Sequence, residues 1–208
     1  MTSKRIARIA VFVLLIIVGG KIVIPLAIPM TLQTFFVIAA GFCLGGKDGL
    51  FACVIYMILG LAGVPVFAMG GGISYVLTPT FGFIAGFSIG AFVAGKSLYS
   101  HKTLSFWKMF ASGILGLAVI YAIGAIYQTI IFVFVNGMNF WEACVMLLNL
   151  TYLFFLDAVQ VALLCLIFPR ASTLIKINEG LIFEKNKKAT ASGISKAKIN
   201  DVGIDNAR

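Results

Sequence analysis

The chain has 208 residues, of which 61% are hydrophobic and only 11% are charged. Soluble globular domains carry about 25% charged residues, so this composition excludes a disordered chain and argues against a water-soluble enzyme domain. Four cysteines are too few for a disulfide-stapled secreted domain. A formal net charge of +9 on such an apolar chain indicates a membrane protein oriented by its positive charges rather than a nucleic-acid-binding protein.

The first apolar segment has two possible interpretations. Basic residues at Lys4, Arg5 and Arg8 followed by the apolar run Ile9–Val18 resemble a secretory signal peptide. The run continues to Ile24, however, and further apolar segments follow it. We therefore interpret it as the first membrane helix.

Charged residues divide the rest of the chain into segments suited to membrane helices, which need about 20 apolar residues each. The uncharged stretch from Asp48 to Lys96 is too long for one helix, and a glycine and proline cluster between Pro65 and Pro79 divides it. We predict an all-α polytopic membrane protein, a bundle of six transmembrane helices. The predicted helices are Ile6–Ile24, Thr31–Leu44, Leu50–Gly63, Phe81–Gly95, Met109–Val135 and Ala143–Phe168.

The distribution of Lys and Arg predicts the orientation of this bundle. With the N-terminus inside, Lys21 is the only one of the 16 Lys and Arg residues that faces outward. We therefore expect both termini on the cytoplasmic side of the cytoplasmic membrane. The loops expected outside are Pro25–Met30, Pro65–Thr80 and Asn136–Trp141. Residues 1–168 are predicted to form the membrane domain, and residues 169–208 a polar, basic and disordered cytoplasmic tail.

Small residues recur every four positions in two of the predicted helices, at Gly82, Gly86, Gly90 and Ala94 and at Gly41, Gly45 and Gly49. This spacing gives a smooth helix face that allows close approach of a neighbour. We expect these faces to pack within the bundle rather than against a partner.

One face of the last predicted helix is polar. Asp157 is the only acidic residue well inside an apolar run, and Asn149 and Gln160 lie within about 80° of it on a helical wheel. A carboxyl in such a segment rarely faces lipid, so this face is expected to point into the bundle. The three side chains form either interhelical hydrogen bonds or a binding site, and we favour the site.

The predicted outer loops have an unusual composition. Gly70, Gly71 and Gly72 allow the backbone to approach a ligand closely, and Phe67, Ser74 and Tyr75 offer ring faces and hydrogen bonds. Gln33 follows the proline-rich first outer loop. Together these segments are expected to cover a partly apolar pocket.

The chain has no recognisable source of chemical energy. The run Gly41–Lys47 fits the start of a phosphate-binding loop, but Asp48 stands where Ser or Thr should hold magnesium. The motifs of metal, nucleophilic and paired-carboxylate catalysis are also missing. We therefore predict a protein that is not an enzyme and has no cofactor.

Three motifs in order carry a resemblance to a known family. They are IPMTLQTFFVIAAGFCLGGKDG from Ile28, ILGLAGVPVFAMGGG from Ile58, and TPTFG from Thr78. The chain resembles, over roughly residues 6 to 168, the BioY family of biotin-binding S-components of energy-coupling-factor (ECF) transporters. The resemblance implies a protein in the lipid bilayer that captures biotin with high affinity for uptake across the cytoplasmic membrane. Its implied partners are a transmembrane coupling subunit and two ATPase subunits.

The resemblance also suggests how the ligand is held. Biotin would enter beneath the outer loops, and its bicyclic ring would pack on Phe36, Phe67 and Tyr75. The residues expected to contact it are Gln33, Phe36, Phe67, Gly70, Gly71, Gly72, Ser74, Tyr75, Asn149, Asp157 and Gln160.

One position departs from the family pattern, which commonly has Lys three residues after the Asp on the last helix. This chain has Gln160 there. Asp157 would then be either a neutral carboxylic acid or a carboxylate that accepts N–H bonds from the ureido group of biotin. The departure leaves an S-component for another small vitamin as an alternative. Stand-alone biotin uptake without an ATPase module is a second alternative, and a non-transport membrane protein is a remote third.

Overall fold

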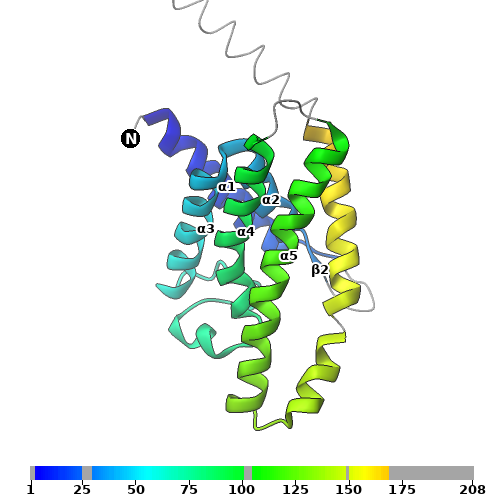
Figure 1. The fold of residues 1–208 in the computed structure, drawn as a ribbon. Coiled ribbons are helices and arrows are strands. Elements are labelled where there is room, and N and C mark those ends of the chain that lie inside the picture. Colours follow the sequence, from blue (N-terminus) through cyan, green and yellow to red (C-terminus); the bar gives the residue numbers. More distant parts are fainter. Residues whose placement is uncertain (1–2, 25–29, 101–104, 149, 169–208) are drawn as a thin grey trace, which may run out of the picture. The chain divides into compact units, whose positions relative to one another are not determined.

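The apolar segments form helices that run alongside one another in the computed structural model (Figure 1). The structure describes residues 3–24, 30–100, 105–148 and 150–168, and those up to Leu166 form one unit. The labelled α-helices are α1 (Ser3–Lys21), α2 (Gln33–Leu44), α3 (Gly46–Leu61), α4 (Phe81–Ser100) and α5 (Phe106–Ile130). A last helix, unlabelled in Figure 1, covers 140–148 and 150–168. The predicted tail at 169–208 lies outside the described residues.

A short antiparallel pair of strands corrects the all-α prediction. Strand β1 (Val23–Ile24) pairs with β2 (Met30–Thr31), with Val23 opposite Thr31 and Ile24 opposite Met30. The first predicted helix therefore ends too late at Ile24, and the second begins too early at Thr31. The physical reason is in the sequence, since Pro25 and Pro29 cannot continue a helix.

The other helix ends also differ from the prediction. Helix α3 begins at Gly46 rather than Leu50, and α4 continues past Gly95 to Ser100. Helix α5 begins at Phe106, and it widens into a π-helical turn over Ile131–Val135. Each of these helices includes residues next to the predicted apolar segment, at the start of α3, the end of α4 and the start of α5.

The segment between α3 and α4 is folded rather than extended. Phe67 and Gly70 form an isolated antiparallel bridge, and a 3₁₀-helix covers Ile73–Leu77. Gly72 has a backbone φ of 111°, which residues other than glycine rarely adopt. Gly71 is equally constrained, because a Cβ there would lie 3.0 Å from the Gly60 carbonyl oxygen. The glycines therefore serve the folding of this segment over the end of α3.

Three of the described helical stretches are long and apolar enough to cross a membrane, namely Phe81–Tyr99, Phe106–Val135 and Phe140–Phe168. Helix α2 is apolar but shorter, with 12 residues. The chain is thus a mostly helical membrane protein.

Polar contacts define one end of the unit. The guanidinium of Arg5 at the start of α1 forms an ion pair with the Asp48 carboxylate at the start of α3. The Tyr99 hydroxyl near the end of α4 donates to the Phe42 carbonyl near the end of α2, at 3.1 Å. The start of α1, the α2–α3 junction and the end of α4 therefore lie together.

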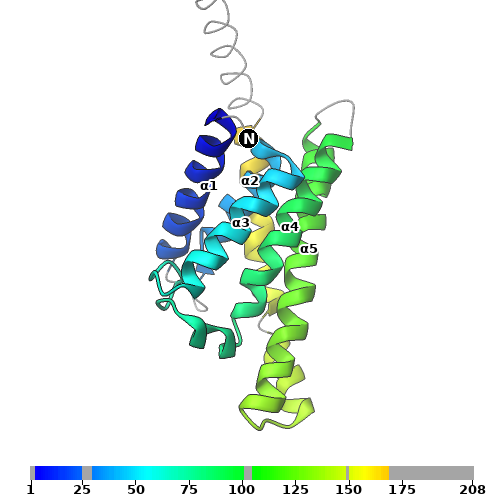
Figure 2. The same cartoon turned by 90° about the vertical axis from the view of Figure 1, so that its left-hand side faces the viewer.

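The opposite end carries the segment between α3 and α4. The ammonium of Lys21, at the end of α1, donates to the Phe67 carbonyl at 2.7 Å. The Tyr127 hydroxyl of α5 donates to the Val76 carbonyl. Helix α5 and the last helix extend past the other helices at this end (Figure 2).

The predicted small-residue face of α4 packs within the bundle, as expected. A Cβ at Gly86 would lie 3.0 Å from the Ile120 carbonyl oxygen of α5, and one at Gly90 would lie 2.9 Å from that of Gly116. Close approach of the two backbones gives α4 and α5 an extensive contact without large side chains.

We expect Gly90→Leu to lower the stability of the folded chain by about 1–3 kcal/mol, because the added side chain must displace α5. Ala118→Leu is the matched control, since Ala118 lies on the exposed side of α5. Thermal unfolding in detergent measures both variants. Equal melting temperatures would contradict the close α4–α5 packing.

Candidate functional site

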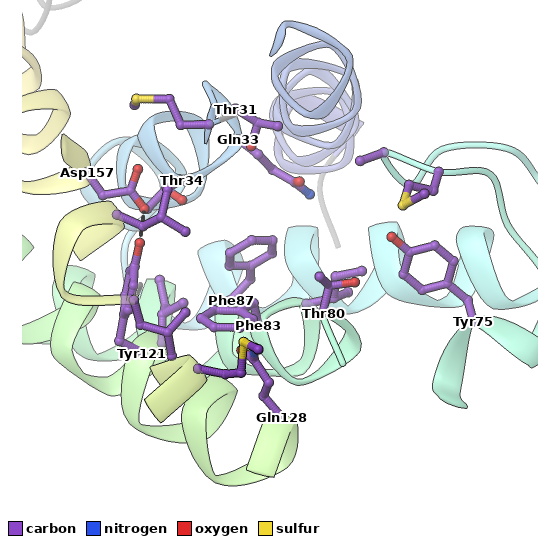
Figure 3. Close-up of a pocket in the computed structure, with 18 of the residues that line it drawn as sticks. Thr31, Gln33, Thr34, Tyr75, Thr80, Phe83, Phe87, Tyr121, Gln128 and Asp157 are labelled. Atoms are coloured by element: carbon purple, nitrogen blue, oxygen red, sulfur yellow. Dashed lines mark hydrogen bonds between the residues drawn. The ribbon is translucent and has the colours of Figure 1, made fainter. Parts of the chain in front are cut away.

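A pocket of about 480 Å³ lies between β2, α2, the α3–α4 segment, α4, α5 and the last helix. Figure 3 shows most of its side chains. The residues lining it are Met30, Thr31, Gln33, Thr34, Ala68, Met69, Tyr75, Thr80, Phe83, Ile84, Phe87, Ile120, Tyr121, Gln128, Phe132, Met146, Leu150, Leu153 and Asp157. Its size suits a small organic ligand.

A hydrogen-bonded cluster around Asp157 forms one end of the pocket. The Tyr121 hydroxyl donates to Asp157 Oδ2 at 2.9 Å, and Gln160 Nε2 donates to Oδ1 at 2.9 Å. Thr34 is a further hydrogen-bonding neighbour, and it lies beside the carboxyl in Figure 3. Asp157 is only 6% exposed. Each carboxyl oxygen can accept more than one hydrogen bond, so acceptor capacity remains for a ligand N–H group.

Gln160 holds this cluster together from behind. Its Nε2 atom also donates to the Thr31 carbonyl at 3.2 Å, which ties the last helix to β2. Gln160 is buried but does not line the pocket. Its role in the structure is therefore to position Asp157.

Gln33 brings an unpaired donor to the pocket. The side chain is 6% exposed, and its Nε2 atom has no hydrogen-bond partner. Tyr56 lies near this amide, but its hydroxyl donates to the Val66 carbonyl, at 3.5 Å. Figure 3 shows the nitrogen pointing into the pocket. A buried donor without a partner costs about 1–3 kcal/mol, so a ligand acceptor at this position would recover that free energy.

The middle of the pocket is apolar. Phe83 and Phe87 are one helical turn apart on α4, and their rings face the cavity together with Ile84 and Ile120. The Phe83 ring lies edge-on to Tyr121, with centroids 5.5 Å apart. The pocket can therefore hold a flat or bicyclic apolar group between two polar regions.

Three polar side chains, Tyr75, Thr80 and Gln128, form the pocket's second end, far from Asp157 (Figure 3). Phe67 supports this end from the core. It is fully buried, and its ring centroid lies 4.6 Å from that of Tyr75.

The structure brings together only part of the predicted site. Asp157, Gln33 and Tyr75 line the pocket, and Gln160 contacts Asp157. The predicted residues that do not line it are Phe36, Phe67, Gly70, Gly71, Gly72 and Ser74. Asn149 lies outside the described residues.

Several pocket residues were missed by the sequence reasoning. Tyr121 and Gln128 lie seven positions apart on α5, which puts two polar groups on one face of an otherwise apolar helix. Phe83 and Phe87 share a face of α4 in the same way. The spacing of these four residues could have predicted that they line a pocket. The position of Thr34 beside Asp157 could not be predicted in this way, because it depends on how α2 packs against the last helix.

The electrostatics of the pocket are one-sided. Among the described residues that line the pocket, Asp157 is the only one with an ionisable acidic or basic side chain other than tyrosine, and none is Lys, Arg or His. Within the described part of the chain, no group of three or more His, Cys, Asp or Glu could hold a metal ion. Hydrogen bonds and apolar contacts therefore determine what the pocket recognises.

The fold and the pocket define a helical membrane protein that can hold a small organic molecule. The family model for BioY matches residues 1–177. The chain belongs to the BioY family.

Relatives cover most of the membrane part of the chain. A probable biotin transporter BioY of Lysinibacillus sphaericus is 38% identical over 143 residues, which is 68% of this chain and 73% of the relative. The biotin transporter BioY of Thermotoga maritima is 44% identical over 123 residues, which is 58% of this chain and 72% of the relative.

The fold has also been seen in a solved structure. The crystal structure of the S-component for biotin from an ECF-type ABC transporter superposes with a TM-score of 0.69. The match covers 83% of this chain and 95% of that chain, at 24% identity.

We expect Tyr121→Phe to destabilise the chain by about 1–2 kcal/mol, because the buried Asp157 carboxyl loses a hydroxyl donor. Tyr152→Phe is the control, since Tyr152 is 40% exposed on the last helix. Thermal unfolding in detergent compares them. A Tyr121→Phe variant as stable as the control would mean that the hydroxyl contributes nothing to holding the carboxyl.

Proposed function

We propose that this chain captures biotin with high affinity as the substrate-binding S-component of an ECF-type transporter. The observation that carries the proposal is the pocket, in which an acceptor at Asp157 and an unpaired donor at Gln33 flank an apolar middle. The family and its biotin-transporting members support the same ligand.

The chemistry of biotin matches these features one by one. The N–H groups of its ureido ring suit the Asp157 carboxyl, and Gln33 Nε2 can donate to an acceptor of the ligand across the apolar middle. Its thioether ring is apolar enough to pack against Phe83 and Phe87. Because the partners are already fixed by the fold, little ordering is needed on binding, and that favours high affinity.

Gln160 is compatible with biotin as the substrate. It stands where the family pattern commonly has Lys, but it lies behind Asp157 and outside the pocket lining. Its amide keeps the carboxyl in place through the bonds to Asp157 and Thr31. The pocket thus retains its acceptor without a cation at this position.

We further propose six membrane-spanning helices in the cytoplasmic membrane, with both termini in the cytoplasm. The segregation of charge supports this orientation. Lys21 is alone at the end that carries the α3–α4 segment, whereas the other Lys and Arg residues of the described helices belong to the start of α1, the start of α3, the end of α4 and the start of α5. Positive residues favour the cytoplasmic side, so the pocket would open toward the outside.

The proposed partners are a transmembrane coupling subunit and two ATPase subunits. The chain itself has no complete nucleotide-binding motif, because Asp48 follows the glycine run and is engaged by Arg5. Energy for uptake would have to come from another chain. Co-purification of the tagged chain from its native membrane tests this assembly.

We expect the detergent-purified chain to bind labelled biotin saturably, and lipoate, thiamine and riboflavin to compete poorly. Asp157→Asn should weaken biotin binding by about tenfold or more, because it replaces an acceptor-only carboxylate in a buried site. Glu142→Gln is the matched control, since it neutralises an exposed carboxylate outside the pocket.

The outcomes separate the alternatives. Folded protein that binds another of these vitamins instead of biotin would contradict the proposed substrate. Unchanged affinity in Asp157→Asn would contradict the assignment of the site while leaving the substrate in place.

A further inference from the structure

The carboxylate of biotin has no counterpart in the pocket lining. The inference rests on the proposed function, and it concerns how the protein accommodates the negative end of biotin. Asp157 is itself acidic, and no cationic side chain lines the cavity. A ligand carboxylate placed beside Asp157 would meet a like charge in a poorly solvated site. The ligand is therefore expected to turn its carboxylate away from Asp157.

Among the Lys and Arg residues of the described helices, Lys21 is the one at the end that carries the α3–α4 segment. Its Nζ atom donates to the Phe67 carbonyl at 2.7 Å, and the two residues after Phe67, Ala68 and Met69, line the cavity. The preceding residue, Gly20, packs against the pocket residue Gln33, because a Cβ there would lie 3.1 Å from Gln33 Oε1. Lys21 therefore lies beside the rim that the α3–α4 segment forms at Ala68 and Met69.

The ammonium can serve the ligand without leaving its present contact. It has three N–H donors, and the bond to Phe67 uses one of them. The side chain is exposed, so the ammonium is accessible to a ligand. The remaining Lys and Arg residues of the described helices lie near the other ends of their helices, beyond the reach of a side chain at this rim.

We propose that Lys21 is a specificity-determining residue that receives the ligand carboxylate at the Tyr75–Thr80 end of the pocket. The negative charge of Asp157 at one end and the positive charge of Lys21 at the other fix the direction in which the ligand lies. Tyr75 and Thr80, which line that end, supply neutral hydrogen bonds to the same group. Lys21 thus selects the charged acid over uncharged derivatives of it.

The test compares biotin with biotin methyl ester, which lacks the negative charge, on the full chain in detergent. Lys21→Gln should weaken biotin binding by at least about fivefold, the size of a partly screened ion pair. Binding of the ester should stay within about twofold, as for surface substitutions in general. Lys21→Arg should restore biotin binding, and Lys47→Gln, an exposed lysine at the start of α3, is the matched control.

Asp157→Asn distinguishes the roles of the two ends of the pocket, since it should weaken the binding of biotin and of its methyl ester alike. If Lys21→Gln weakens both ligands equally, Lys21 only fastens the α3–α4 segment through Phe67, and the inference is overturned. An unchanged affinity for biotin overturns it as well. A wild-type chain that fails to bind biotin at all overturns the proposed function, whereas loss of the Lys21 effect alone does not.

Discussion

Removing the Asp157 carboxyl from bulk water is costly unless hydrogen bonds replace those that it loses. The replacement comes from Tyr121 of α5 and from Gln160 of the same helix. Gln160 in turn reaches the backbone of β2 at Thr31. The need to satisfy one buried carboxyl thus joins α5, β2 and the last helix, and the space that they enclose with α2 and α4 is the pocket.

Some parts of the molecule support the pocket by packing around it, and others line it. The glycine faces of α4 and α5 bring two backbones together and place Phe83 beside Tyr121. The glycines of the α3–α4 segment allow a folded cover whose Phe67 ring is buried in the core. Neither set of glycines is among the residues that line the pocket. A carboxyl, an unpaired amide and two aromatic rings remain as the recognition surface.

Some of this arrangement could be predicted from the sequence. A carboxyl and a glutamine three positions apart in an apolar run must share a helix face, which is how Asp157 and Gln160 were found. The small-residue repeat of α4 also predicted the close helix packing that the structure shows. The family match covers the motifs at Ile28, Ile58 and Thr78. Phe67 was expected at the ligand because it offers a ring face in the glycine-rich loop, and Phe36 because the family resemblance suggested that the biotin rings pack on it. Their orientation depends on tertiary packing, and neither lines the pocket. Thr34 and Tyr121 were missed for the converse reason, since only the register between helices brings them to Asp157.

The most direct test of this account is an experimental structure of the detergent-purified chain with biotin bound. The account predicts ligand density in the pocket between α4, α5, β2 and the last helix, with the ureido group at Asp157, the fused rings against Phe83 and Phe87, and the carboxylate directed toward Lys21. Biotin bound at another surface of the chain, or in this pocket without a contact to Asp157, would contradict it.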